Sequence, residues 1–227
     1  MNLSQIAARA AIHGLALRGA FHTDPHDEIF VDAISTPAGT IVPLGFAGRR
    51  GWPIFAASAE MADGRADPLD RWSRRIVEGL AAETGGSALF PFDGPPWHPF
   101  QAWAQRGDAV TPSPIGLLID PVFGLWHSYR GALAFAEPLD LPQRLPAPSP
   151  CASCAGKPCL SACPVGAFRP DGYNVAACRA HLSSEAGAPC LGGGCLARRA
   201  CPVGRDHAYG VDQTAFLMRA FRCAGPT

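Results

Sequence analysis

Residues 151–168 read CASCAGKPCLSACPVGAF and set Cys151, Cys154, Cys159 and Cys163 close together, with Pro164 directly after the last of them. A tight run of three cysteines followed by a Cys-Pro pair is typical of chains that bind iron–sulfur clusters through thiolates. In such runs the first three thiolates bind one cluster, and the cysteine before proline binds another. The C-terminal third of the chain is therefore predicted to handle low-potential electrons.

The cysteines that follow supply the remaining ligands. Cys178 stands alone, and CLGGGCLARRACPVG at 190–204 adds three more, so that the phrase Cys-Pro-Val-Gly occurs twice and indicates two related half-sites. Crossed ligation, as the bacterial ferredoxin pattern prescribes, predicts two sets of four ligands. One set is Cys151, Cys154, Cys159 and Cys201, the other is Cys163, Cys178, Cys190 and Cys195, and Cys223 is left over.

Other uses of the nine cysteines stay open. Structural zinc sites usually repeat two tight cysteine pairs, whereas here one tight run is completed by separated Cys-Pro elements. Disulfides normally staple small secreted chains. The spacings from Cys190 to Cys195 and Cys201 are longer than standard, so one cluster beside a degenerate second site is the alternative to two [4Fe-4S] clusters. Gly192–Gly194 would let the backbone fold closely around inorganic sulfide.

Composition limits the class of protein. The 227 residues are 48% hydrophobic and 17% charged, with a formal net charge of zero. This balance predicts a globular chain without a nucleic-acid partner, and no apolar run approaches the roughly 18 residues that a membrane span needs. The N-terminus reads as an amphipathic helix and lacks the features of a secretory signal, so a cytoplasmic location is expected.

Residues 1–140 read as a mixture of helices and strands. Asp67 is expected to cap the clearest helix, with Pro68 in its first position and Gly85 at its end. Hydrophobic periodicity and apolar runs predict helices at residues 3–17, 67–85, around Trp103 and at 212–222, and strands at 29–34, 40–46 and 87–92.

The segment before the cysteines predicts a hairpin and then a boundary. Residues 115–135, IGLLIDPVFGLWHSYRGALAF, indicate two buried strands joined by a turn containing Pro121 and Gly124. The proline-rich connector LPQRLPAPSP cannot continue either strand, so a boundary is expected near residue 148. The predicted domains are an α/β domain at 1–148 and an iron–sulfur domain with a C-terminal helix at 149–227, which make an α+β chain.

Three phrases carry a family resemblance. LLIDPVFGLWHSYRGALAF, then LPQRLP and the cysteine run, resembles the segment of epoxyqueuosine reductases and reductive dehalogenases that leads from a corrinoid-binding domain into a two-cluster ferredoxin domain. Cys178 in ACRAHLSSE sits like the isolated cluster ligand of those enzymes. Separately, GTIVPLGFAG, DPLDRWSRRIVEGL and the 115–135 segment occur in the order seen in the cobalamin-processing decyanase family.

The resemblance implies a nitroreductase-like, corrinoid-binding α/β domain followed by a bacterial-ferredoxin-like domain with two [4Fe-4S] clusters. Cobalamin would be a second cofactor, since its reduction to cob(I)alamin requires a donor of very low potential. Asp120 stands where the reductases often show His, and no catalytic acid can be matched. A lone His in a strand, such as His127, is more often a core residue than a ligand. The expected corrinoid contacts are Phe123, Gly124, Trp126, His127 and Tyr129.

Three functions follow as hypotheses. The first is an iron–sulfur electron-transfer protein that binds a corrinoid and reduces or processes cobalamin, as a cobalamin reductase that reactivates a corrinoid enzyme such as methionine synthase. Its electrons would come from a flavodoxin, a ferredoxin or a flavin reductase. The second is a two-cluster ferredoxin-type carrier without corrinoid. The third is a small reductive dehalogenase or an enzyme like epoxyqueuosine reductase.

Overall fold

A computed structural model describes residues 1–24, 26–31, 36–143 and 148–223. Its contacts divide the chain into two compact units, which are described separately below. The sheet unit consists of Met1–Ala109 and His127–Pro146, and the cysteine unit consists of Val110–Trp126 and Ala147–Thr227. Segment 110–126, which we expected in the first domain, thus belongs to the cysteine unit. The domain boundary near residue 148 itself stays a prediction.

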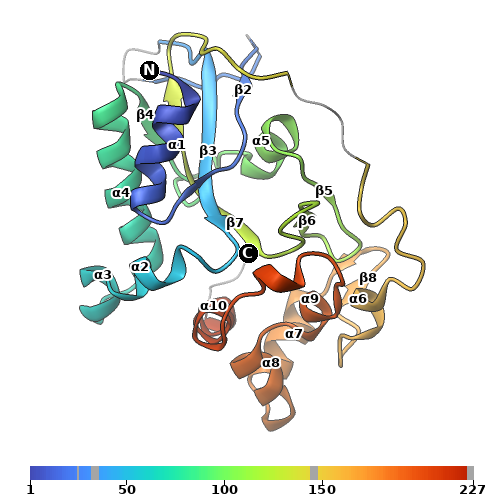
Figure 1. Cartoon of the computed structure of the whole chain (residues 1–227). Coiled ribbons are helices and arrows are strands. Elements are labelled where there is room, and N and C mark those ends of the chain that lie inside the picture. The colour runs from blue at the N-terminus through green and yellow to red at the C-terminus, as the bar shows by residue number, and fades with distance from the viewer. Residues whose placement is uncertain (25, 32–35, 144–147, 224–227) are drawn as a thin grey trace. The chain divides into compact units, whose positions relative to one another are not determined.

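The sheet unit is built on an antiparallel sheet (Figure 1), in which five strands of the described chain take the order β1-β3-β7-β4, with β2 also paired to β3. Helices α1 and α4 contact each other, and α4 also contacts β7. The elements are α1 (Leu3–Ile12), β1 (Ala16–Leu17), β2 (Phe21–His22), β3 (Thr40–Ala47), α2 (Trp52–Ala56), α3 (Ala59–Ala62), α4 (Pro68–Thr84), β4 (Ser87–Leu89), α5 (Phe100–Gly107) and β7 (His127–Phe135).

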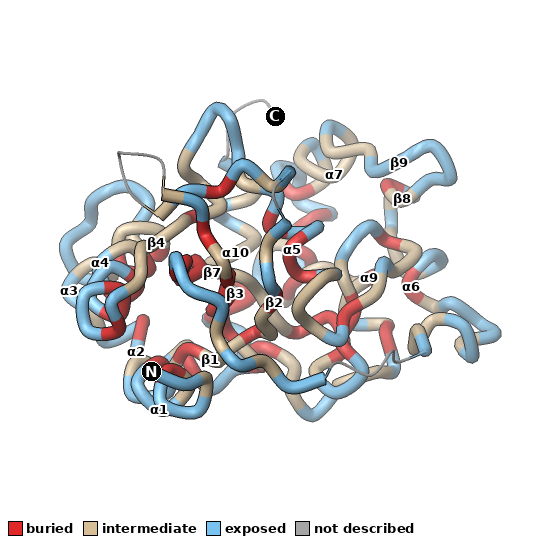
Figure 2. Tube along the Cα trace, turned by 90° about the horizontal axis from the view of Figure 1, so that it is seen from above, coloured by how far each residue is buried: buried red, intermediate tan, exposed pale blue. Residues whose placement is uncertain are grey.

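Both faces of the central strands are covered, and Figure 2 shows β3 and β7 among the buried parts of the tube. Ile41 and Ala132 belong to a cluster with Phe100 and Trp103 of α5 on one face. Because side chains alternate along a strand, Gly131 points to the other face, where a Cβ would meet Val77 of α4. A sheet buried on both faces explains why β3 reads as a continuous apolar run rather than an alternating one.

Most predicted elements of the sheet unit are found, with corrections at their ends. Helix 3–17 ends at Ile12, because Ala16 and Leu17 pair with β3 instead. Asp67 adopts a left-handed conformation and makes no capping hydrogen bond, so its expected role was wrong. The strand expected at 29–34 is reduced, over 29–31, to a bridge between Phe30 and Pro37; its residues 32–34 lie outside the described ranges. Strand 87–92 ends at Leu89.

The hairpin expected at 115–135 was also wrong. Strand β6 (Leu118–Ile119) pairs with β5 (Thr111–Pro112), whereas β7 pairs with β3 and β4. Between them, one Asp120 carboxylate oxygen accepts hydrogen bonds from the amides of Val122 and Phe123 at 2.7 and 2.8 Å. Asp120 and Gly124 also exchange both backbone hydrogen bonds. Because this loop closes on itself, the chain after β6 does not return to pair with β6 as it would in a two-stranded hairpin.

We expect the Gly45→Ala substitution to destabilise the sheet unit. The register of β3 against β7 shifts between Leu44 and Gly45, and a Cβ on Gly45 would lie 1.7 Å from the Ser128 carbonyl oxygen. The backbones would have to separate, at a cost of about 1–3 kcal/mol or more. Urea unfolding followed by far-ultraviolet circular dichroism measures this change.

The matched control is Gly79→Ala within α4, where nothing lies within 4 Å of a new Cβ. Removing a helix-interior glycine there should stabilise the protein by about 0.5–1 kcal/mol. Equal effects of the two substitutions would show that the close approach at Gly45 does not matter for stability.

The cysteine unit consists of short elements joined by turns. Helix α10 packs on α8 and α7, and α6 packs on α9. Among the described helices of the chain, none combines the length and apolar character that crossing a bilayer requires. The elements are β5, β6, α6 (Pro158–Ser161), β8 (Phe168–Arg169), β9 (Gly172–Tyr173), α7 (Val175–Leu182), α8 (Ala188–Gly193), α9 (Leu196–Ala200) and α10 (Val211–Cys223), the last close to the predicted 212–222.

Candidate metal centre

The first four cysteines sit on a chain of tight turns. The amide of Cys151 donates to the Ser149 hydroxyl, and the amide of Cys154 donates to the Cys151 carbonyl at 3.4 Å. Lys157 takes a left-handed conformation, and Pro158 then begins α6, which carries Cys159. These turns place the thiols of Cys151, Cys154 and Cys159 on one short segment.

One group of cysteines is completed from a distant part of the sequence. Burial raises the pKa of the Cys151 thiol, and the thiols of Cys201 and Cys159 raise it further. Burial also raises the pKa of Cys159, again with a contribution from Cys201. Cys154 adds to both effects. Such mutual effects arise only between nearby sulfurs, so Cys201 joins the group although it follows Cys159 by more than forty residues.

These same four cysteines line one small pocket of the cysteine unit. Apart from Lys157, the rest of its lining is apolar: Pro114, Ile119, Pro150, Pro158, Pro202 and Val203. A pocket of four thiols in apolar surroundings has the donor chemistry of a soft metal site, because thiolates are the ligands of iron–sulfur clusters. Metal binding would displace protons from these thiols, against the raised pKa of Cys151 and Cys159. The residues present therefore fit an iron–sulfur cluster.

The other cysteines form a second group around α7, α8 and the start of α9. Burial raises the pKa of Cys190, and the thiols of Cys178 and Cys163 raise it further. Burial likewise raises the pKa of Cys195, with Cys178 and Cys190 contributing. The sulfur of Cys163 accepts a hydrogen bond from the Ala167 amide at 3.3 Å. Cys178, isolated in the sequence, is thus close to the thiols of Cys190 and Cys195.

The structure brings the eight cysteines together in the two sets that crossed ligation predicts, and it leaves Cys223 exposed at the end of α10. That each set binds a cluster stays a prediction. Among the described residues, no group of three His, Cys, Asp or Glu side chains is arranged to hold a single metal ion. A cubane makes a different demand, because each thiolate binds a separate iron atom.

Segment 110–126 is the part of the site that sequence reasoning missed. Ile115, Ile119 and Leu125 pack in one cluster with Cys159 and Cys201, so this segment provides the apolar cover of the first cysteine group. The signal was present in the apolar residues of 115–125, but it was read as a strand of a hairpin. An apolar cover excludes water from a cluster and tunes its reduction potential.

Two glycines explain how this segment comes so close. A Cβ on Gly124 would lie 2.0 Å from the Val203 carbonyl oxygen, and a Cβ on Gly204 would lie 2.3 Å from the Phe123 carbonyl carbon. Both glycines have positive φ angles, 58° and 69°. Backbone therefore packs directly on backbone where the second Cys-Pro-Val-Gly phrase meets the 120–124 loop.

We expect Gly204→Ala to lower both the stability and the iron content of the cysteine unit. The substitution places a methyl group inside the contact with Phe123, at a cost of about 1–3 kcal/mol beyond that of its positive φ. Gly166→Ala is the matched control, because Gly166 ends the first Cys-Pro-Val-Gly phrase with a φ of 55° but has nothing within 4 Å of a new Cβ. Iron assay and thermal unfolding under anaerobic conditions compare the two variants, and equal losses would contradict the contact.

The five expected corrinoid contacts fall in both units, and their role stays a prediction. In the cysteine unit, the Phe123 ring contacts His207, and Trp126 contacts Tyr209 with centroids 5.5 Å apart. In the sheet unit, the His127 and Tyr129 rings meet edge to face. The contacts of Gly124 are those with Val203 described above.

The Tyr129 hydroxyl is engaged within the sheet unit. It donates to an Asp108 carboxylate oxygen at 3.0 Å, and Arg18 binds the same oxygen at 2.7 Å. Burial and the Asp108 charge raise the pKa of Tyr129 well above its usual value. These contacts hold Tyr129 as a neutral phenol in a buried charged cluster.

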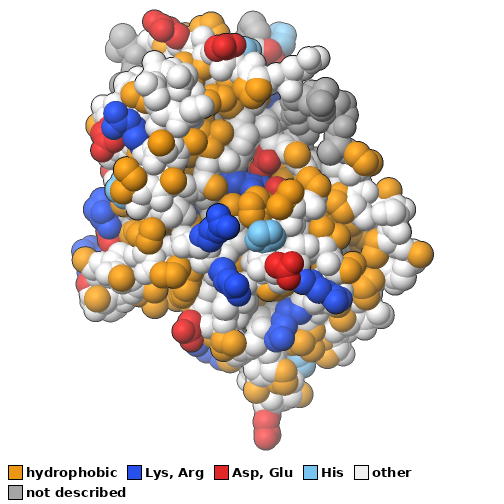
Figure 3. All heavy atoms as spheres, viewed as in Figure 1, with side chains coloured by type: hydrophobic (Ala, Val, Ile, Leu, Met, Phe, Trp, Pro, Cys, Tyr) orange, Lys and Arg blue, Asp and Glu red, His pale blue; other side chains and the backbone are white. Residues whose placement is uncertain are grey.

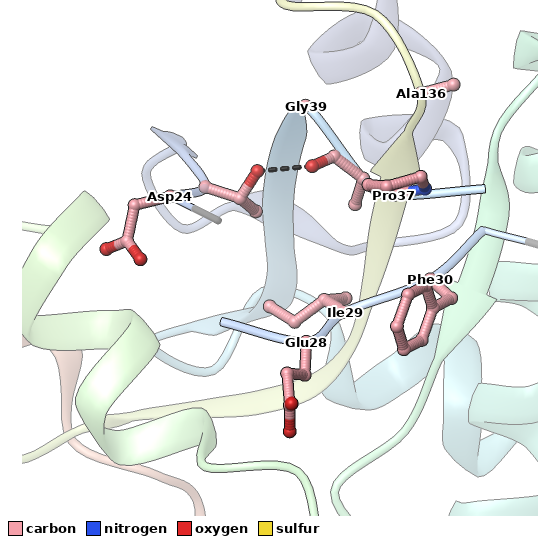
Figure 4. A pocket seen from close by; sticks show the side chains of 9 residues that line it. Asp24, Glu28, Ile29, Phe30, Pro37, Gly39 and Ala136 are labelled. Carbon is pink, nitrogen blue, oxygen red and sulfur yellow. Dashed lines mark hydrogen bonds between the residues drawn. The ribbon is translucent and has the colours of Figure 1, made fainter. Parts of the chain in front are cut away.

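A pocket of the sheet unit contains none of the expected residues. It is lined by Asp24, Glu28, Ile29, Phe30, Ala136 and neighbouring residues. Figure 4 shows the Asp24 and Glu28 carboxylates lying apart rather than pointing at a common point. Asp24 also lies 3.8 Å from Arg106 as an ion pair.

Comparison with known proteins gives a fold. No protein-family model matches the chain, and no curated protein matches it. A selenomethionine-labelled epoxyqueuosine reductase is similar in structure, with a TM-score of 0.53 and 13% identity over 93% of this chain and 68% of that chain. An epoxyqueuosine reductase solved with an epoxyqueuosine-modified tRNA stem loop gives 0.52 and 13%, over 92% and 66%. The epoxyqueuosine reductase of Streptococcus thermophilus gives 0.50 and 16%, over 93% and 69%.

At these identities the likeness concerns the fold. The chain is a mixed α+β protein that resembles epoxyqueuosine reductases over most of its length, and its cysteine-rich C-terminal region is consistent with a ferredoxin-like part. It spans about two thirds of the length of each of those chains. The resemblance to epoxyqueuosine reductases is thus confirmed for the fold, whereas those to reductive dehalogenases and to the decyanase family stay predictions.

Proposed function

We propose that this chain is an iron–sulfur electron-transfer protein that binds a corrinoid and reduces or processes cobalamin. The observation that carries the iron–sulfur part is the arrangement of eight cysteines in two groups of four, with the first group in a single apolar pocket. The fold shared with epoxyqueuosine reductases supports the same reading. The corrinoid part rests on the sequence phrases and on the low-potential chemistry that they would require.

In this proposal some residues would bind the clusters and others would exclude water from them. Cys151, Cys154, Cys159 and Cys201 would hold one cluster, and Cys163, Cys178, Cys190 and Cys195 the other. Bound [4Fe-4S] clusters supply one-electron transfer at low potential. Ile115, Ile119 and Leu125 exclude water from the first group, and the Ala167 amide hydrogen bond to Cys163 stabilises negative charge on that sulfur.

The electron donor in this proposal is a flavodoxin, a ferredoxin or a flavin reductase. The protein that would be reactivated is a corrinoid enzyme such as methionine synthase. A cytoplasmic location, without nucleic-acid or membrane partners, accompanies this role. An epoxyqueuosine reductase-like activity is a second candidate that the shared fold favours. Against it, the Asp120 carboxylate binds the amides of its own loop, and no substrate-binding acid can be named.

Anaerobic purification with iron, sulfide and cobalt quantified per chain tests the proposal. About eight iron and one cobalt per chain are expected for two cubanes and one corrinoid. Four iron with stoichiometric zinc would refute the ligand scheme. A colourless preparation without an electron paramagnetic resonance signal after dithionite would refute the redox role.

The corrinoid is tested on the same material. After cobalamin is added, cobalt-dependent absorbance bands should co-elute with the reconstituted protein during gel filtration. Full iron without retained cobalamin would leave a two-cluster ferredoxin-type carrier and remove the corrinoid from the proposal.

A further inference from the structure

A second pocket of the cysteine unit lies outside both cysteine groups. Its volume is about 250 Å³, slightly below the usual range for small-ligand sites. Residues from the end of α8, from α9, from the turn at 205–209 and from the start of α10 line it. The side chains and backbone that matter here are Trp126, Gly193, Arg199, Arg205, Tyr209 and Thr214.

Two buried polar groups of this pocket have no hydrogen-bond partner among the described residues. They are the indole Nε1 of Trp126 and the hydroxyl of Tyr209. Their residues are only 3% and 8% exposed. Buried polar groups are nearly always satisfied, because desolvating them without a partner is costly. Two such groups lining one pocket indicate a ligand that accepts hydrogen bonds, since an indole N–H can only donate.

The charged side chains of the pocket are all cationic. Arg199 donates to the Gly193 carbonyl at 3.0 Å, and Arg205 donates to the Cys201 carbonyl at 3.4 Å. Each guanidinium has five N–H donors, so most of them remain for a ligand. No carboxylate lines the pocket, and the described residues form no ion pair with either arginine.

A third arginine holds the two aromatic rings in place. The Arg198 guanidinium lies 4.7 Å from the Trp126 ring centre and 4.6 Å from that of Tyr209. It also donates to the Leu125 carbonyl at 3.0 Å. Arg198 therefore adds positive charge beside the pocket and stacks on the rings of two residues that line it. In Figure 3, Lys and Arg side chains are visible over the region of α9.

We propose that this pocket binds the phosphate or carboxylate group of a small molecule. The fork of a guanidinium matches both groups, and charge-assisted hydrogen bonds from it are strong. Arg199 and Arg205 bind the anion, and Tyr209 and Trp126 donate the remaining hydrogen bonds. One of the anion's proposed ligands, Arg205, also donates to the Cys201 carbonyl. The inference requires neither iron nor corrinoid.

Calorimetric titration of the anaerobically purified full chain with inorganic phosphate, and separately with acetate, tests the proposal at constant chloride. At least one of the two anions should bind at one site per chain. Arg205→Ala and Arg199→Ala should each weaken that binding about tenfold or more, which is the effect of losing one charge-assisted hydrogen bond. Tyr209→Phe, which keeps the ring, should weaken it several-fold.

Arg169→Ala is the matched control, because Arg169 is an exposed arginine of the same unit that does not line the pocket. It should leave the affinity unchanged. Absence of binding by both anions, or an equal loss in Arg169→Ala and Arg205→Ala, would overturn the proposal. Iron is assayed on each sample, so binding without iron would separate failure of the proposed function from failure of this site.

Discussion

Cys159→Ser should remove about half of the iron from the anaerobically purified chain, and Cys190→Ser should remove the other half. The physical reason is that each cubane needs four thiolates and that the two residues belong to different groups. The decisive comparison uses pairs of substitutions. Cys159→Ser with Cys201→Ser should lose no more iron than either alone, whereas Cys159→Ser with Cys190→Ser should lose all of it.

Cys223→Ser is the control for this series, since Cys223 is exposed and belongs to neither group. It should retain full iron and an unchanged paramagnetic resonance spectrum after reduction. The crossed scheme would be wrong if Cys201→Ser and Cys190→Ser removed the same cluster.

Asp108→Ala should destabilise the sheet unit by about 3–5 kcal/mol, because it leaves a buried guanidinium without its carboxylate. The Arg18 and Asp108 side chains are 4% and 12% exposed, and their closest atoms lie 2.7 Å apart. Tyr129→Phe should cost only about 1 kcal/mol, since it removes a single hydrogen bond to Asp108. Urea unfolding of the full chain under anaerobic conditions provides the measurement.

Glu83→Ala offers the comparison for that prediction. Glu83 pairs with Arg9 at 2.9 Å, but the two side chains are 51% and 45% exposed. Exposed pairs contribute roughly 0–1 kcal/mol. The double variant Arg18→Met with Asp108→Ala should recover part of the loss. If Asp108→Ala cost no more than Glu83→Ala, the buried cluster would have no special role in stability.

Local signals predicted the regular elements well. Helix α4 follows from Pro68 at its start, Gly85 at its end and the apolar spacing between them, and the structure has it at Pro68–Thr84. Strand β3 follows from an unbroken apolar run. Both signals lie within the element itself, so they do not depend on contacts with distant parts of the sequence.

The 110–126 segment could not be predicted in the same way. Its two-residue strands and its packing on Cys159 and Cys201 depend on partners far along the sequence. The turn predicted at Pro121 and Gly124 is present, closed by backbone hydrogen bonds between Asp120 and Gly124. Periodicity does not indicate which strand a turn leads to. Tyr209 of the anion pocket was missed because a single tyrosine carries no pattern.

The cysteine grouping was predictable because metal-ligand spacing records a three-dimensional constraint in the sequence. Four thiolates must converge on one small volume, so the Cys-Pro element far from the tight run had to return to it. In the crossed scheme the two Cys-Pro-Val-Gly phrases would supply the exchanged ligands, and both phrases end in a glycine with positive φ. No comparable constraint marks the residues expected to face a corrinoid.

The alternation of the two units along the chain has a consequence for biosynthesis. The sheet unit lacks β7, which pairs with both β3 and β4, until residue 135 has been made, and by then residues 110–126 of the cysteine unit have already been synthesised. The first cysteine group lacks Cys201 until residue 201 has been made. Neither unit can therefore close before these later segments have been made, and in the proposed ligand scheme the first cluster would be completed only on a chain that extends at least to residue 201.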